Sequence, residues 1–182
     1  MFDTINGIPL HPLVVHVVVV LLPLAIIGAF AVVLRADWRD RYGMLVVAVA
    51  GLATLAIPVA TSSGEALQSR VGNPGEHAEL GDQLIWFALP LFVLLAAYVG
   101  MHRLASHGTR LTAERSASRP VVGLAGRLVA GRGSALVAGL TLVAALASGV
   151  QVYRVGDSGA RAAWGHTSSG PAASSPGQVS GR

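Results

Sequence analysis

The sequence predicts an all-α fold, a polytopic four-helix bundle that spans a membrane. Hydrophobic residues make up 53% of the chain and charged residues only 12%, with a mean hydropathy of +0.62. A soluble domain carries about a quarter charged residues. Four apolar stretches are each close to the roughly 20 residues that a helix needs to cross a bilayer. The chain has no cysteine, which excludes disulfides, thiolate metal sites and cysteine nucleophiles.

The predicted spans cover approximately residues 9–34, 42–60, 80–102 and 134–155. At about 1.5 Å of rise per residue, each is long enough to cross the hydrocarbon core of a bilayer. Pro23 lies in the middle of the first span and should bend that helix. In the last span, Thr141, Ala145 and Gly149 recur at four-residue spacing. Such small residues let another helix approach closely, including one from a second copy in a homodimer. We find no internal repeat in the sequence.

The distribution of arginine predicts the orientation of the spans. Four crossings place both termini and the loop between spans two and three on one side of the membrane. Nine of the thirteen arginines fall on the opposite side, after spans one and three. An excess of arginine marks the cytoplasmic side, so both termini are expected outside the cytoplasm. Residues 1–10 contain no Lys or Arg, so we expect the first span to be retained rather than cleaved as a signal peptide.

We expect residues 1–164 to form one four-span domain, whose main partner is the lipid bilayer. Within it, residues 103–133 are rich in Arg, Ser and Gly and predict a flexible cytoplasmic loop. Residues 165–182 are small, polar and interrupted by Pro and Gly, which predicts a disordered tail. The arginines are spread over the connecting segments rather than packed into one patch, which argues against a nucleic-acid partner.

The predicted topology gathers ten titratable residues at the outer face. His16 lies roughly 7.5 Å deeper than His11 along the first span. The two rings point roughly 140° apart, so each histidine needs its own partner. For His16 that partner could be a carbonyl of a neighbouring helix or a hydroxyl such as Thr61 or Ser62, and for His11 a capping or interfacial role is open. The ten residues are His11, His16, Glu65, Glu76, His77, Glu79, Asp82, Arg154, Asp157 and Arg161.

Two histidines from facing helices can ligate haem iron, because neutral imidazole is an ordinary axial ligand. The sequence leads to the hypothesis that His16 and His77 hold a b-type haem, with His11 beside them. Arg154 and Arg161 would then pair with the haem propionates, or with nearby carboxylates instead. A metal bound by protein side chains alone is less favoured, since His77 and its neighbour two residues on cannot point the same way on a helix.

Three stretches of this sequence resemble a known family. HPLVVH opens the first span, TSSGEAL leads to HAELGD before the third, and YRVGDSGARAAW follows the fourth. Together they resemble a bacterial membrane family, the domain of unknown function 2231, over roughly residues 7 to 164. The resemblance implies a four-helix integral membrane domain of the bacterial plasma membrane without an assigned activity, sometimes joined to redox modules. His11, Pro12 and His16 match its HP-x-x-x-H mark, whereas Val17 and Val18 stand where Phe and Pro are common.

For function, the hypothesis is a redox accessory without catalytic residues, which binds haem b and serves a redox partner protein. Two alternatives from other classes remain. One is a structural or assembly subunit without a cofactor, whose histidines lock helices together by hydrogen bonds. The other is a small transporter with a proton relay, for which the second and fourth spans offer no charged residue apart from Arg154 near the end of the fourth.

Overall fold

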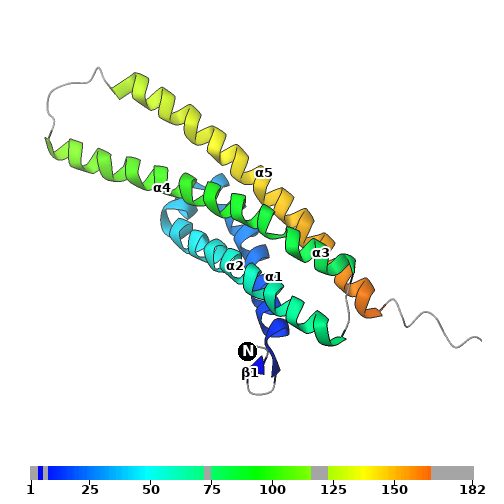
Figure 1. The fold of residues 1–182 in the computed structure, drawn as a ribbon. Helices are drawn as coiled ribbons and strands as arrows, with labels where there is room; N and C mark the ends of the chain where they lie inside the picture. Colours follow the sequence, from blue (N-terminus) through cyan, green and yellow to red (C-terminus); the bar gives the residue numbers. More distant parts are fainter. Residues whose placement is uncertain (1–3, 6–7, 72–74, 116–122, 165–182) are drawn as a thin grey trace, which may run out of the picture.

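The chain forms a bundle of four long helical spans (Figure 1). The computed structural model describes residues 4–5, 8–71, 75–115 and 123–164. Two short antiparallel strands, β1 (Thr4–Ile5) and β2 (Ile8–Pro9), lead into the first helix. The helices are α1 (Leu10–Leu34), α2 (Ala36–Val71), α3 (Glu76–Gln83), α4 (Ile85–Arg115) and α5 (Gly123–Trp164).

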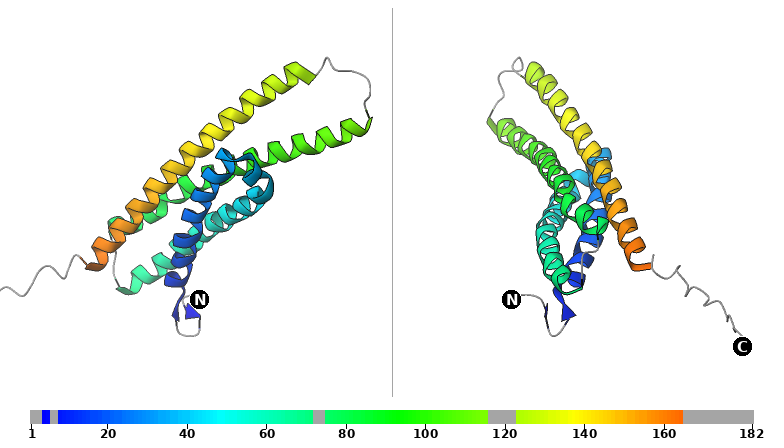
Figure 2. Two further views of the ribbon diagram at one scale, coloured as in Figure 1. Left: turned by 180° about the vertical axis from the view of Figure 1, so that it is seen from behind. Right: turned by 45° about the vertical axis from the view of Figure 1, so that its right-hand side comes forward.

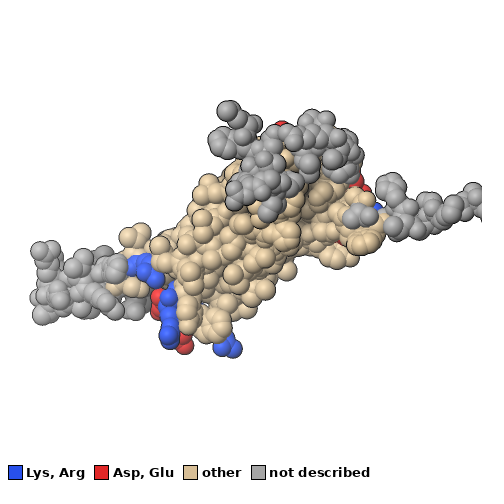
Figure 3. All heavy atoms as spheres, turned by 90° about the horizontal axis from the view of Figure 1, so that it is seen from below, with Lys and Arg blue, Asp and Glu red and all other residues tan. Residues whose placement is uncertain are grey.

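Four segments are long and apolar enough to cross a membrane, which confirms the predicted number of spans. They are His11–Leu34, Ala36–Ala66, Glu76–Ser106 and Gly131–Ala162. The last three have 31, 31 and 32 residues, more than a perpendicular crossing needs, so they can tilt or emerge from the bilayer. Where grey atoms do not cover the middle of the molecule in Figure 3, its surface is tan, and blue arginine atoms gather near the left end with red carboxylates beside them.

The first two spans form a tight antiparallel hairpin. Only Arg35 lies between α1 and α2, and its N–H donates to the Ala31 carbonyl at 3.0 Å. The helices come close where Gly28 faces Val46, since a Cβ added at Gly28 would lie 2.6 Å from Val46 Cγ1. Small residues at the interfaces of membrane helices allow such close packing.

The third span is interrupted once, between α3 and α4. The N–H of Leu84 donates to the Gly81 carbonyl at 3.1 Å, three residues back, instead of to Leu80 four residues back. The freed Leu80 carbonyl accepts a hydrogen bond from Gln151 Nε2 of α5 at 3.0 Å. Gln151 is only 1% exposed, so water has little access to this site. The Gln151 amide therefore supplies the hydrogen-bond partner that the buried Leu80 carbonyl lacks in its own helix.

The core lies between all four spans, around the buried side chains of Leu22, Leu91 and Leu95. Thr141 and Ala145 of α5 are also fully buried, so the predicted stripe of small residues packs inside one chain. The third member, Gly149, is half-buried, and a Cβ there would meet nothing within 4 Å. A homodimer stays a prediction, and it would need a surface other than Thr141 and Ala145.

The loop expected over residues 103–133 is helical wherever it is described. α4 continues to Arg115 and α5 begins at Gly123, so the two helices extend past the α1–α2 turn (Figure 2). Ala, Leu, Arg and Glu favour helix even where charge keeps a segment out of lipid, and this explains the difference. The expected tail, residues 165–182, lies outside the described residues.

Candidate functional site

A cavity of about 680 Å³ lies between the spans, at the end of the bundle that holds the start of α1, all of α3 and the end of α5. Apolar side chains such as Val15, Val18 and Ile57 form much of its wall. Five of the ten predicted outer-face residues line it, which are His11, Glu65, His77, Glu79 and Asp82. The three carboxylates belong to exposed residues, whereas both histidines are half-buried.

His11 of α1 is held against α2. Its Nδ1 lies 3.0 Å from the carbonyl oxygen of Ala60 and 3.3 Å from Ser63 Oγ. The edge of the ring rests on Gly64, where an added Cβ would lie 3.0 Å from His11 Cε1. A side chain at position 64 would therefore push the imidazole out of place.

His77 of α3 is held against α5 by the same set of contacts. Its Nδ1 lies 3.1 Å from the carbonyl oxygen of Val155 and 3.4 Å from Ser158 Oγ. Its ring rests on Gly159, where an added Cβ would lie 3.0 Å from His77 Cε1. Both histidines thus meet a carbonyl, a serine three residues later, and the glycine that follows it.

These contacts set the tautomer of both rings. A carbonyl oxygen can only accept, so each Nδ1 must carry the proton and donate it. The hydroxyls of Ser63 and Ser158 donate to the carbonyls of Ala60 and Val155, each at 2.9 Å, so they offer only a lone pair to the ring. In a neutral imidazole with Nδ1 protonated, Nε2 keeps a free lone pair. The neutral ring with this tautomer is the form in which histidine binds metals through Nε2.

The structure places His16 away from the cavity. Its side chain is exposed, and its Nδ1 donates to the Pro12 carbonyl one turn back in its own helix. Thr61 and Ser62, considered as its partners, bond to the Pro58 and Val59 carbonyls instead. His11 rather than His16 therefore shares the cavity with His77.

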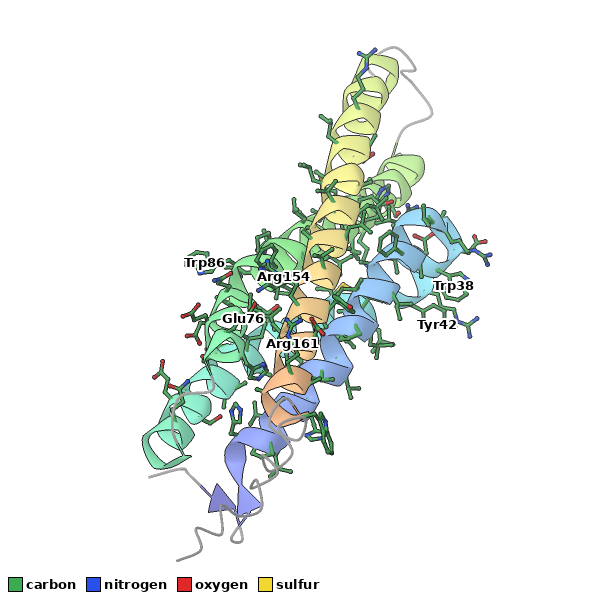
Figure 4. The ribbon with its side chains drawn as sticks, turned by 90° about the vertical axis from the view of Figure 1, so that its right-hand side faces the viewer. Trp38, Tyr42, Glu76, Trp86, Arg154 and Arg161 are labelled. Carbon is green, nitrogen blue, oxygen red and sulfur yellow. The ribbon has the colours of Figure 1, made fainter. Side chains whose placement is uncertain are left out.

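The remaining residues of the predicted group do not line the cavity, and all of them except half-buried Asp157 are exposed. Glu76 belongs to α3, and Arg154 and Arg161 belong to α5, all at this end of the bundle (Figure 4). Arg161 forms an ion pair of 2.7 Å with Asp157 one turn back, which is one of the pairings that the sequence left open. The side chains of both partners reach solvent, so this pair contributes little to stability.

Within the described part of the chain, no three His, Asp or Glu side chains are arranged to hold a metal ion. Haem iron makes a smaller demand, because the porphyrin supplies four ligands and the protein only the axial ones. Two imidazoles with free Nε2 atoms fit that demand better than a site built from side chains alone.

Sequence reasoning missed the residues that fix the two rings. In the sequence these residues stand in polar segments near the ends of spans, with nothing that links them to a histidine; they are Ser63, Gly64, Ser158 and Gly159. The available signal was the recurrence of Ser-Gly in TSSGEA and in GDSGAR, but the same pair also occurs at 148–149, 169–170 and 180–181. Serine and glycine are common in such segments, so the recurrence pointed to no contact until the histidines were placed against it.

The comparison with protein families supports the fold. A family model with the description "Predicted membrane protein (DUF2231)" matches residues 7–169. That range includes His11 and His77, the Ser63–Gly64 and Ser158–Gly159 pairs, and all four spans. No curated protein and no solved structure matches the chain.

Proposed function

This chain belongs to the family of predicted membrane proteins of domain of unknown function 2231, and on that premise we propose that it is a redox accessory protein that binds one b-type haem through His11 and His77. The observation that carries the proposal is that both rings line one cavity with Nδ1 hydrogen-bonded and with no hydrogen-bond partner for Nε2 among the described residues. A bound haem would supply one-electron transfer.

The cavity suits a macrocycle in size and in lining. Its volume of about 680 Å³ is in the range of ligand pockets, roughly 300–1,000 Å³. Val15, Val18 and Ile57 offer an apolar wall to a porphyrin ring. The exposed carboxylates at the cavity would repel propionates, so a cation must balance these groups. Arg154 is exposed and does not itself line the cavity, but it lies on α5 within one turn of the lining residues Val152 and Val155, and we assign this role to it.

This proposal keeps the cofactor expected from the sequence and changes one ligand. His11 replaces His16, because His11 lines the cavity whereas His16 bonds within its own helix. Arginine-rich connections favour a cytoplasmic location for the α1–α2 turn. We therefore place the cavity at the extracytoplasmic face of the bacterial plasma membrane, where a redox partner protein would dock.

The experiment is a reduced-minus-oxidised visible spectrum of the protein expressed in a haem-competent host and purified in detergent. We expect a b-type spectrum that His11→Ala and His77→Ala abolish. The matched control is His16→Ala, on the same helix as His11, which should leave the spectrum unchanged. A folded protein that stays colourless even after haemin is added would refute the proposal.

Loss of fold must be separated from loss of a ligand, since each histidine also joins two helices. Helical content by circular dichroism should be similar in all three variants. In His11→Gly and His77→Gly, added imidazole should restore part of the spectrum, because it can occupy the space that the ring leaves. If His16→Ala removes the spectrum and His11→Ala does not, the ligand assignment is wrong.

One observation favours the structural alternative. His11 joins α1 to α2 and His77 joins α3 to α5, so each ring links two helices whether or not a cofactor is present. A structural subunit would show the destabilisation of the histidine variants without any visible absorption. The spectrum therefore separates the two functions, whereas a stability measurement alone does not.

A further inference from the structure

The two halves of the chain repeat one arrangement. In each half a histidine near the start of the first helix bonds a carbonyl and a serine near the end of the second helix, and the ring rests on the following glycine. The first half is α1 with α2, and the second is α3 and α4 with α5. Because α1 also packs on α5 and α2 on α4, the helices of one half meet the non-equivalent helices of the other.

The repeat extends along the first helix of each half. His77 lies 66 positions after His11. Further along these helices, five pairs of buried residues are separated by the same 66 positions. Both members of every such pair are buried. The buried pairs are Val18 and Leu84, Leu22 and Ala88, Ala25 and Leu91, Ala29 and Leu95, and Val32 and Tyr98.

The second helices repeat with a different offset, of 95 positions. It relates Ser63 to Ser158 and Gly64 to Gly159. It also relates the buried pairs Ala50 and Ala145, and Ala53 and Ser148. The offsets differ because one residue joins α1 to α2, whereas α4 extends further and residues 116–122 separate it from α5. A self-comparison at one fixed offset would therefore align only one helix of each half.

The buried pairs also show why the residues themselves do not repeat. A large side chain in one half is matched by a small one in the other at Leu22 and Ala88, and the reverse holds at Ala25 and Leu91. A core packed at nearly constant density tolerates such exchanges when the total volume is kept. The positions are equivalent although the letters differ.

We infer that the chain is an internal repeat of one helical hairpin, and that the repeats contribute equivalent halves of a single two-imidazole ligand site. One half is His11 with Ser63 and Gly64, and the other is His77 with Ser158 and Gly159. Ser63, Gly64, Ser158 and Gly159 are positioning residues, which act on a ligand through the ring that they hold. The inference rests on the proposed function for the identity of the ligand, but not for the equivalence of the two halves.

The equivalence is tested first without a cofactor, by ¹⁵N NMR of the protein with labelled histidine in detergent. Single His→Gln variants assign the ring signals. We expect His11 and His77 to show the same tautomer, with Nδ1 protonated and Nε2 bare. Ser63→Ala should shift the ring signals of His11 alone, and Ser158→Ala those of His77 alone. Different tautomers for the two rings would overturn the inference, whatever the protein binds.

The second test uses the haem-loaded protein. Two equivalent imidazoles should give a six-coordinate, low-spin iron, which electron paramagnetic resonance detects. Ser63→Ala and Ser158→Ala should each raise the rate of haem loss by about threefold, because each removes one of the two acceptors that share the Nδ1 proton. Ser63→Thr and Ser158→Thr retain the hydroxyl and should restore the wild-type rate. A five-coordinate, high-spin iron that depends on only one histidine would overturn the equivalence while leaving haem binding intact.

The two failures are thus distinguishable. If the protein binds no haem but both rings share one tautomer and respond to their own serines, the proposed function fails and the repeat stands. If haem binds through a single histidine, the proposed function stands in part and the equivalence of the halves fails.

Discussion

Arg39 and Tyr98 join α2 to α4 at the end of the bundle opposite the histidines. Arg39 NH1 donates to Tyr98 Oη at 3.0 Å, and the guanidinium carbon lies 5.7 Å from the centre of the tyrosine ring. Tyr98 is only 4% exposed, so its hydroxyl has little access to water. This contact joins α2 and α4 near the α1–α2 turn, where Arg35 and Arg41 also lie.

Tyr98→Phe should therefore destabilise the bundle. The variant keeps the ring under the guanidinium and removes the acceptor of a charged donor, a hydrogen bond of about 1.5–3 kcal/mol. Thermal unfolding in detergent measures the effect. The matched control is Tyr42→Phe on the exposed surface of α2, where the ring contacts with Arg41 and Trp38 survive the change. Equal shifts for the two variants would show that the hydroxyl of Tyr98 is dispensable.

Gly28→Ala should loosen the first hairpin. The new Cβ would lie 2.6 Å from Val46 Cγ1, and overpacking of this kind costs about 1–3 kcal/mol. Gly139→Ala on α5 is the control, since a Cβ there meets nothing within 4 Å and should stabilise the helix by about 0.5–1 kcal/mol. In the double variant Gly28→Ala, Val46→Ala the clash is relieved, so part of the lost stability should return. If the double variant is no more stable than Gly28→Ala alone, contact with Val46 is not the cause of the destabilisation.

Gln151→Leu should destabilise the junction of α3 and α4. The change leaves the buried Leu80 carbonyl without the amide that bonds it at 3.0 Å, a loss of about 1–3 kcal/mol. Gln83→Leu, at an exposed position of α3, should stay within about 0.5 kcal/mol of the wild type. Chemical unfolding in detergent compares the two. A stable Gln151→Leu variant would mean that the junction does not depend on this amide.

The orientation in the membrane can be tested directly, because the chain has no cysteine of its own. We expect Ala160→Cys, exposed near the end of α5, to react with a membrane-impermeant maleimide in intact cells. Ala36→Cys, exposed at the α1–α2 turn, should react only after the cells are permeabilised. The opposite pattern would reverse the orientation that the arginines predict.

The four spans could be predicted from the sequence because hydrophobic length alone identifies them. The predicted spans 42–60 and 134–155 fall inside α2 and α5, whereas 9–34 begins one residue before α1 and 80–102 includes the turn at Leu84 between α3 and α4. The outer-face grouping also followed from the number of crossings. The choice between His11 and His16 did not, because α1 is apolar on every side and no polar stripe shows how the helix is turned. Only the packing reveals that His11 shares a face with buried Val18 and Leu22.

The partners of the histidines were beyond sequence reasoning for a related reason. Ala60 and Val155 act through backbone carbonyls, and a backbone acceptor leaves no trace in residue type. Gly64 and Gly159 matter by what they lack, since each gives an imidazole the space that a Cβ would fill. The two unequal offsets then concealed the correspondence of the halves.

The single residue between α1 and α2 has a consequence for the order of folding. A connection as short as Arg35 makes the entropy of closing the first hairpin small, and its contacts are local in sequence. In a chain synthesised from its N-terminus, we expect this hairpin to pack before α5 has emerged. The second hairpin, with its longer connection, would then assemble on a surface already in place, so the first half acts as a template for the second.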